Sequence, residues 1–247
     1  MAAAQVTASQ TQETLEQYMP FLIEIRKRLL FLVSTFLITG VLGFIYYEKL
    51  IIFILKIFSL EGVNIVFTSP FQFVNLAITS GFSIAIVILF PLILFQFLSF
   101  LKPALTGREY KTILLLLPLS LVLFVAGFAF GVLTMRYVII LFYQKSVELQ
   151  IGNFLDISTL LSQILITSVL MGVAFQFPIV LTILMRLGIV THQTLTKRRL
   201  WVYVGSLLFA VLLPPTDLLS LFLLFLPLAL LFEITLLLNR RTVKAHR

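Results

Sequence analysis

The stretch that organises this chain is Phe100-Leu-Lys-Pro-Ala-Leu-Thr-Gly-Arg-Glu-Tyr-Lys111, a short charged segment between two long apolar runs. It carries one carboxylate, Glu109, among three cations. The preceding run has no charged residue from Gly62 to Leu101, and the following run has none from Thr112 to Met135. This alternation predicts two apolar helices joined by a polar loop.

A second segment near the N-terminus repeats the pattern. It reads Phe21-Leu-Ile-Glu-Ile-Arg-Lys-Arg28 and again has one carboxylate, Glu24, among three cations. If both segments lie on the same side of a membrane, two isolated carboxylates face one compartment from a basic surface.

Composition places the chain in a membrane. Its 247 residues are 60% hydrophobic and only 11% charged, whereas a soluble domain has roughly a quarter charged residues. The absence of cysteine excludes disulfides, iron–sulfur clusters and thiolate metal sites. The two histidines, His192 and His246, fall in short polar segments and cannot assemble a metal cluster or a histidine-based triad. We therefore expect no metal and no cofactor.

The charge-free runs predict an all-α polytopic membrane protein with six transmembrane helices. The expected spans are Leu29–Tyr47, about 76–101, Thr112–Met135, Ile157–Met185, Leu200–Leu213 and Leu218–Leu238. The first exceeds the usual apolar core of a signal peptide and lacks an A-x-A-type site, so we expect it to be retained. The last two are expected to be short, above all Leu200–Leu213, whose 14 residues reach about 21 Å against a hydrocarbon core of roughly 30 Å.

Around these spans, residues 1–20 are expected to form a flexible N-terminal tail, 21–241 a single six-helix domain, and 242–247 a C-terminal tail. Asp156 is expected to cap the start of the fourth span.

The basic residues predict the orientation. Six spans place both termini on one side, and fourteen of the 18 basic residues lie there: Arg26, Lys27, Arg28, Lys102, Arg108, Lys111, Arg186, Lys197, Arg198, Arg199, Arg240, Arg241, Lys244 and Arg247. Because cytoplasmic loops are enriched in Lys and Arg, both termini are expected in the cytoplasm, or in the equivalent stroma or matrix. The net charge of +8 then reports topology and does not indicate nucleic-acid binding.

Both carboxylates have an ordinary structural explanation. Thr106 to Glu109 fits the capping box [S/T]-x-x-[D/E] ahead of an apolar run, and Glu24 is spaced to pair with Arg28 on one helix face. A functional explanation comes from their scarcity. A cationic ligand would be repelled by this basic side unless carboxylates are fixed where it lands, and arginine suits them best because its planar fork can bind a carboxylate bidentately.

Four motifs, in order, resemble the TatC family, the multispanning subunit of the twin-arginine translocase. Phe21–Arg28 is similar to the family's H-L-x-E-L-R-x-R-like opening, and Phe100–Glu109 to its F-x-x-P-A-L-x-x-x-E first cytoplasmic loop. Gly172-Val-Ala-Phe-Gln-Phe-Pro178 resembles its fourth-span motif. Pro214-Pro-Thr-Asp217 with Phe232-Glu233 resembles its last two spans, and the similarity runs from about residue 15 to 241.

The resemblance implies a receptor for signal peptides carrying paired arginines on folded cargo. It implies an oligomeric platform that gathers single-span TatA and TatB subunits, with transfer driven by the proton-motive force in a bacterial plasma membrane, a thylakoid or a mitochondrial inner membrane. By motif position, Glu24 and Glu109 would receive the guanidinium groups, Arg26 would orient its neighbours, and the loop would be shaped by Phe100, Pro103 and Leu105.

The resemblance also implies contacts with partner helices at Gln176, Leu212 and Asp217. Many relatives carry Glu at the position of Gln176, and the neutral amide here rules out a titrating carboxylate. A hydrogen bond to a partner helix and an internal helix–helix hydrogen bond both remain open for this side chain.

Two other functions fit the sequence less well. A small-solute secondary transporter would predict an internal repeat and charged or unwound mid-span sites, and the chain shows no matching halves. An intramembrane enzyme would need a motif such as H-E-x-x-H or G-x-S-x-G, and none is present. The chain is therefore not expected to be an enzyme, and the transporter remains the alternative.

Overall fold

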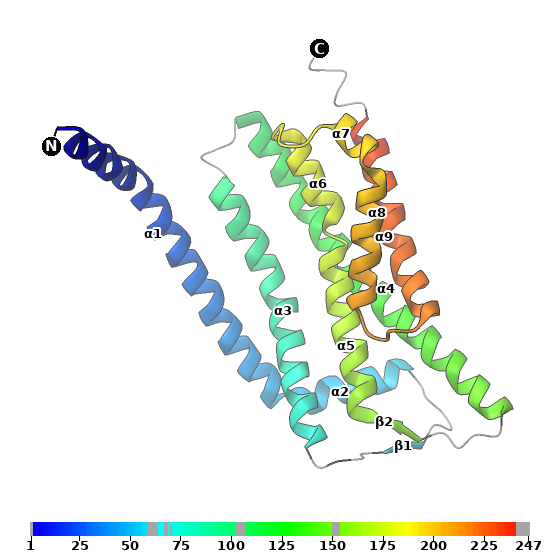
Figure 1. Cartoon of the computed structure of the whole chain (residues 1–247). Coiled ribbons are helices and arrows are strands. Elements are labelled where there is room, and N and C mark those ends of the chain that lie inside the picture. Colours follow the sequence, from blue (N-terminus) through cyan, green and yellow to red (C-terminus); the bar gives the residue numbers. More distant parts are fainter. Residues whose placement is uncertain are drawn as a thin grey trace.

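The computed structural model describes residues 2–58, 64–66, 69, 71–101, 107–149 and 154–240 (Figure 1). In chain order the elements are α1 (Ala2–Ile45), α2 (Tyr47–Phe58), β1 (Asn64–Val66), α3 (Gln72–Leu101), α4 (Gly107–Glu148), β2 (Phe154–Asp156), α5 (Ile157–Ala174), α6 (Phe177–Arg186), α7 (His192–Lys197), α8 (Arg199–Leu212) and α9 (Leu218–Asn239).

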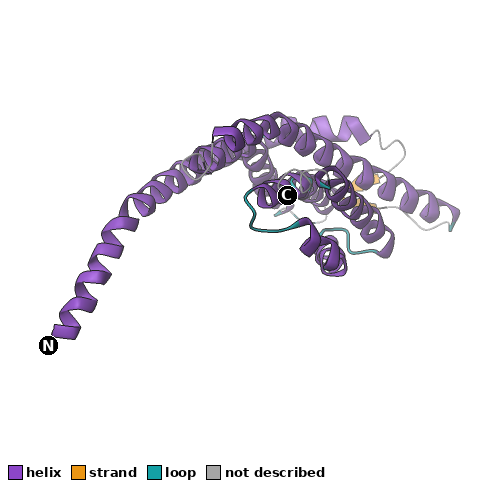
Figure 2. Cartoon of the chain, turned by 90° about the horizontal axis from the view of Figure 1, so that it is seen from above, coloured by secondary structure: helices purple, strands orange, loops and turns teal. Residues whose placement is uncertain are grey.

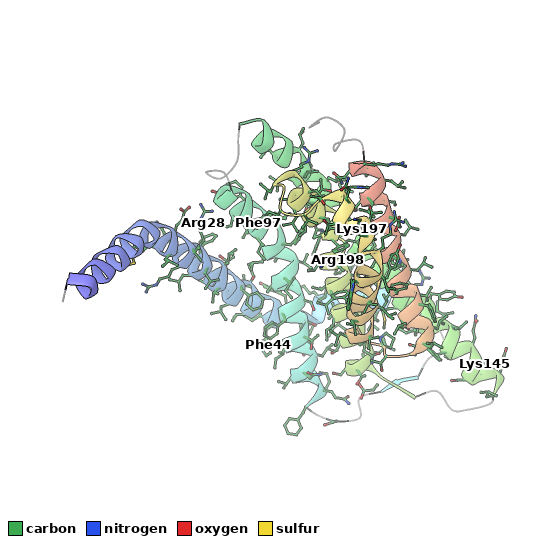
Figure 3. All side chains as sticks on the ribbon, turned by 45° about the horizontal axis from the view of Figure 1, so that its top comes forward. Arg28, Phe44, Phe97, Lys145, Lys197 and Arg198 are labelled. Carbon is green, nitrogen blue, oxygen red and sulfur yellow. The ribbon has the colours of Figure 1, made fainter. Side chains whose placement is uncertain are left out.

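The helices run between two ends of the molecule (Figure 1). One end, here the N/C end, holds the start of α1, the end of α3, the start of α4, the turn from α6 through α7 into α8, and the end of α9. The opposite end holds α2, both strands and the connection from α8 to α9. In Figure 3, Arg28 is labelled at the N/C end and Lys145 at the far end of α4. The start of α1 and the end of α9 thus lie at the same end of the molecule.

Helix α1 is longer than the predicted first span. It extends over 44 residues, and its N-terminal part projects away from the other helices when the molecule is seen from above (Figure 2). The backbone of residues 2–20, expected as a flexible tail, is therefore helical and continuous with the span. Flexibility of this segment stays a prediction.

Glycines bring α1 and α3 into close contact. A Cβ atom added to Gly81 would lie 2.7 Å from the carbonyl oxygen of Gly40 and 3.1 Å from the backbone nitrogen of Phe44. Small residues allow such backbone approach, and this is how helices associate where lipid removes the hydrophobic driving force between them. The contact fixes α1, which is largely exposed elsewhere, against α3.

The predicted fourth span is two helices in series. Helix α5 ends at Ala174 and α6 begins at Phe177, with Pro178 in its first turn. Proline lacks an N–H and its ring clashes with the carbonyl four residues earlier, which is that of Ala174. The apolar path nevertheless continues over the 30 residues Ile157–Arg186. At the end of α6, Gly188 adopts a φ of 71°, the left-handed conformation that commonly ends a helix.

A short strand pair lies beside the helices of the predicted all-helical protein. Strands β1 and β2 pair in parallel, with Ile65 opposite Leu155. Each has only three residues, too few for a periodic signal in the sequence. The pair lies at the opposite end of the molecule. Asp156, the last residue of β2, caps α5 as predicted, because it accepts a hydrogen bond from the Thr159 nitrogen at 2.8 Å.

Five helical segments are long and apolar enough to cross a membrane, and α8 is a shorter apolar helix, within the residues that the structure describes. The expectation of two short final spans holds only for α8. Helix α9 has 22 residues and reaches about 33 Å, which exceeds the hydrocarbon thickness. Helices α8 and α9 pack together, and a buried cluster that includes Met171, Ala210 and Leu224 joins them to α5.

We predict that Gly81→Ala destabilises the protein by about 1–3 kcal/mol, because its methyl group would press into the backbone of α1. Thermal unfolding in detergent measures the effect. Gly205→Ala is the matched control, since a Cβ there has no neighbour within 4 Å. The control should be neutral or stabilising, because alanine favours a helix over glycine. Equal melting temperatures for the two variants would contradict the close packing.

We also predict local thinning of the bilayer beside α8. Its 14 residues reach about 21 Å, and a short apolar stretch is accommodated by thinning the bilayer or by shielding from neighbouring helices. Spin labels placed at Leu200 and Leu212, both exposed, would report their depth in vesicles. One label at the headgroups and the other deep in the hydrocarbon core would contradict local thinning, because the short helix would then end inside a bilayer of full thickness.

Candidate functional site

The guanidinium of Arg28 is the centre of the polar contacts at the N/C end. Its Nη1 donates to the backbone oxygen of Gln96 at 2.9 Å and to the side-chain oxygen of the same residue at 3.0 Å. Its Nη2 donates to Oγ of Ser99 at 3.1 Å. Figure 3 labels Arg28 on α1 and Phe97, between these two partners, on α3. Arg28 thus connects α1 to the last turns of α3.

The same guanidinium binds the first predicted carboxylate. Nε and Nη2 of Arg28 both donate to Oε1 of Glu24, at 3.0 and 2.5 Å. The Glu24 side chain is 46% exposed, and that of Arg28 only 21%. The predicted i,i+4 pair is therefore present, and it is part of a larger network that the spacing alone did not indicate. Glu24 stays accessible from solvent on one side.

Arg26, expected to orient its neighbours, is not part of this network. It is exposed, and it has no partner among the residues whose side chains the structure describes. Two residues correspond to about 200° around a helix, so Arg26 points away from the face that carries Glu24 and Arg28. Helical periodicity could have put Arg28 on the same face as Glu24, but it could not have shown that α3 packs on that face.

The second predicted segment is described only in part. Pro103 and Leu105 lie outside the described residues, and the structure gives only the backbone of Phe100 and Glu109. Helix α4 begins at Gly107, which is where the capping box placed a helix start, and Glu109 is in its first turn. Glu109 thus lies where α4 starts at the N/C end (Figure 1), and Glu24 is bonded to Arg28, which Figure 3 labels at the same end.

Gln176 has internal partners. Its side-chain oxygen accepts a hydrogen bond from the hydroxyl of Ser120 on α4. Its Nε2 donates to the backbone oxygens of Ser120 and Gly172, at 3.1 and 3.3 Å. The residue is 8% exposed. This is the internal helix–helix hydrogen bond that the sequence left open, and it joins the break between α5 and α6 to α4. A contact to a partner helix through Gln176 stays a prediction.

Asp217 and Leu212 lie at the opposite end, where α8 turns into α9. Asp217 caps α9, because its carboxylate accepts hydrogen bonds from the Ser220 nitrogen at 2.8 Å and from the Ser220 hydroxyl at 2.6 Å. Leu212 is 81% exposed at the end of α8. Between them, the hydroxyl of Thr167 on α5 donates to the carbonyl of Pro214. The turn is thereby fixed to the bundle while Leu212 faces outward.

Sequence reasoning missed the partners of Glu233. Its Oε1 accepts a hydrogen bond from the Tyr203 hydroxyl at 2.5 Å, and its Oε2 lies 3.4 Å from Nη1 of Arg199. These residues connect α9 to α8 beside a cavity of about 310 Å³ that His192 and Arg240 also line. Glu233 is therefore paired within the chain. Among the described residues there is no group of His, Cys, Asp and Glu that could hold a metal ion.

Comparison with known proteins gives one consistent family. The family model of the Sec-independent protein translocase protein (TatC) matches residues 20–227. TatCy of Bacillus subtilis (strain 168) is 32% identical over 88% of this chain and 86% of its own length. TatC of Aquifex aeolicus (strain VF5) is 30% identical over 91% of this chain and 95% of its own length. These matches confirm the predicted family.

A solved structure agrees with the sequence matches. A crystal structure of the twin arginine translocase receptor TatC, in DDM, superposes with a TM-score of 0.77 at 29% identity. The superposition covers 88% of this chain and 98% of the other. The fold described above is thus the fold of that protein.

We predict that Gln176→Leu lowers stability by about 1–3 kcal/mol, because the buried Ser120 hydroxyl loses its acceptor. Adding Ser120→Ala should recover most of the loss, since replacing both partners by apolar groups is nearly neutral. Thermal unfolding of both single variants and the double variant gives the coupling energy. Additive losses would show that the two side chains do not interact.

Proposed function

This chain belongs to the TatC family of Sec-independent protein translocase proteins, and on that premise we propose that it binds the paired arginines of a twin-arginine signal peptide at its N/C end. Members of this family are receptor subunits of the twin-arginine protein export system. The chain is accordingly a multi-pass membrane protein and a component of protein transport, not an enzyme.

The observation that carries the proposal is the accessible carboxylate of Glu24 on a basic surface. Its side chain is 46% exposed, and the cations Arg26 and Lys27 on the same turn are exposed too. A guanidinium approaching this surface is attracted only where a carboxylate faces it, and each charge-assisted hydrogen bond contributes about 1.5–3 kcal/mol. Glu109, at the start of α4, would supply the second acceptor, with Phe100, Pro103 and Leu105 shaping the loop.

The orientation in the membrane follows from charge. We assign six crossings, with α8 as the short one, and place the N/C end in the cytoplasm, because the basic residues gather there. The relatives in Bacillus subtilis and Aquifex aeolicus are bacterial, which supports a bacterial plasma membrane over a thylakoid or a mitochondrial inner membrane. Residues 21–241 would then form the membrane domain between two tails.

Exposed apolar helix faces support the assembly role. Leu115, Trp201 and Leu212 are each more than 70% exposed, and such faces can bind lipid or the single helices of TatA- and TatB-type subunits. We place one partner-helix contact at Leu212 and Asp217 and another near Gln176, where side chains of the partner would have to pack around an amide that is already satisfied. We further propose that the chain oligomerises in the complex and that its cargo is folded. The proton-motive force would drive the transfer.

The direct test is Glu109→Gln. We expect signal-peptide binding to weaken by about 10- to 100-fold, because an ionic acceptor becomes a neutral amide that cannot form a charge-assisted pair. Photo-crosslinking from residues 21–28 and 100–111 to a synthetic twin-arginine signal peptide measures binding, and the amount of protein in the membrane checks insertion.

Two controls belong to this test. Glu148→Gln makes the same change at an exposed glutamate of the opposite end and should leave crosslinking unchanged. A signal peptide with a Lys pair should bind more weakly than one with an Arg pair, since an ammonium lacks the planar fork. Normal crosslinking and export by Glu109→Gln would count decisively against the site.

A further inference from the structure

We propose that Arg28 is a positioning residue of the signal-peptide site, which holds the Glu24 carboxylate in one orientation for the incoming arginine. This inference rests on the proposed function and adds to it a residue that does not itself touch the signal peptide. It follows from the way in which one guanidinium is shared between α1 and α3.

The anchor of Arg28 lies on α3. Its Nη1 binds both the backbone and the side-chain oxygen of Gln96, and its Nη2 binds Ser99. Only 21% of the Arg28 side chain is exposed, and three hydrogen bonds to α3 hold it in place independently of Glu24. A planar fork anchored in this way has little freedom to rotate, so its remaining N–H bonds have a set direction.

That direction selects one oxygen of Glu24. Both hydrogen bonds from Arg28 fall on Oε1, and Oε2 has no partner among the residues whose side chains the structure describes. A carboxylate that is free to rotate must be ordered when a ligand binds, and this ordering weakens binding. Arg28 orders Glu24 in advance and leaves Oε2 as the acceptor for the guanidinium of the signal.

The anchor also links the two recognition segments. Gln96 and Ser99 lie in the last turns of α3, directly ahead of the loop that leads to Glu109. Arg28 therefore fixes the position of Glu24 relative to the C-terminal end of α3, where this loop begins. A receptor for two neighbouring arginines needs such a fixed spacing between its two acceptors.

A competing explanation makes the opposite prediction. Arg28 could occupy Glu24 as a placeholder that the arginine of the signal must displace. Removal of the placeholder would then tighten signal-peptide binding, whereas removal of a positioning residue weakens it. The sign of the change in Kd separates the two.

The experiment measures the Kd of a fluorescent twin-arginine signal peptide for the full-length chain in its complex. Ser99→Ala is the most informative variant, because Ser99 bonds to Arg28 and has no contact with Glu24 among the hydrogen bonds of the described residues. We expect it to weaken binding by about 2- to 10-fold, and Arg28→Lys, which loses the fork, by about tenfold or more. Lys197→Ala, which removes an exposed cation of α7 at the N/C end, is the control and should change Kd less than about twofold.

A second readout separates positioning from mere stability. The ratio of Kd values for Lys-pair and Arg-pair peptides should fall in Arg28→Lys and in Ser99→Ala, because a rotating carboxylate discriminates less between a fork and a point charge. A variant that is only partly unfolded would lose binding of both peptides equally, and its ratio would not change. Melting temperatures in the same detergent identify any variant that does not fold.

The experiment distinguishes failure of the positioning role from failure of the proposed signal-peptide site. If Glu24→Gln and Glu109→Gln both bind the peptide normally, the signal-peptide site itself is wrong. If those two variants lose binding while Ser99→Ala and Arg28→Lys retain wild-type Kd and ratio, or if Arg28→Ala binds more tightly, the positioning role is overturned and the site stands.

Discussion

The guanidinium of Arg28 makes five hydrogen bonds, two to Glu24 on its own helix and three to α3. An arginine near the edge of a membrane domain is costly unless its donors are satisfied, and α3 satisfies those that Glu24 does not. Farther along, the same two helices meet at Gly43 and Gly81, where their backbones approach too closely for a side chain. Polar pairing at one level and glycine contact at another therefore hold α1, which has few other neighbours, against the rest of the molecule.

The same rule governs the polar groups deeper in the bundle. Gln176 is bonded to Ser120, and Glu233 to Tyr203 and Arg199. In each case the partner lies on a neighbouring helix, so the polar contact also fixes how two helices pack. Asp156 and Asp217 instead satisfy the free N–H groups at the starts of α5 and α9.

The helices are unequal in length, and this shapes the outer surface. Helix α8 has 14 residues beside the 22 of α9, and the turn that joins them is fixed by Thr167 to α5. The end of α8 thus lies at a depth set by packing rather than by its own length. Its exposed residues, Leu212 above all, form an apolar surface that suits lipid, and partner helices would compete for this surface under the proposed function.

The sequence by itself determined the long apolar runs, the cap at Asp156 and the family, because these depend on local hydropathy and motif spacing. It also predicted the pair of Glu24 with Arg28 and the start of the helix that carries Glu109. It did not determine the strand pair, the internal partner of Gln176, the pairing of Glu233 or the choice of Arg28 over Arg26. Those depend on which helix faces which. Contacts such as Arg28 with Gln96 join residues 68 positions apart in the chain, and no local pattern specifies a partner at that separation until the helices have packed.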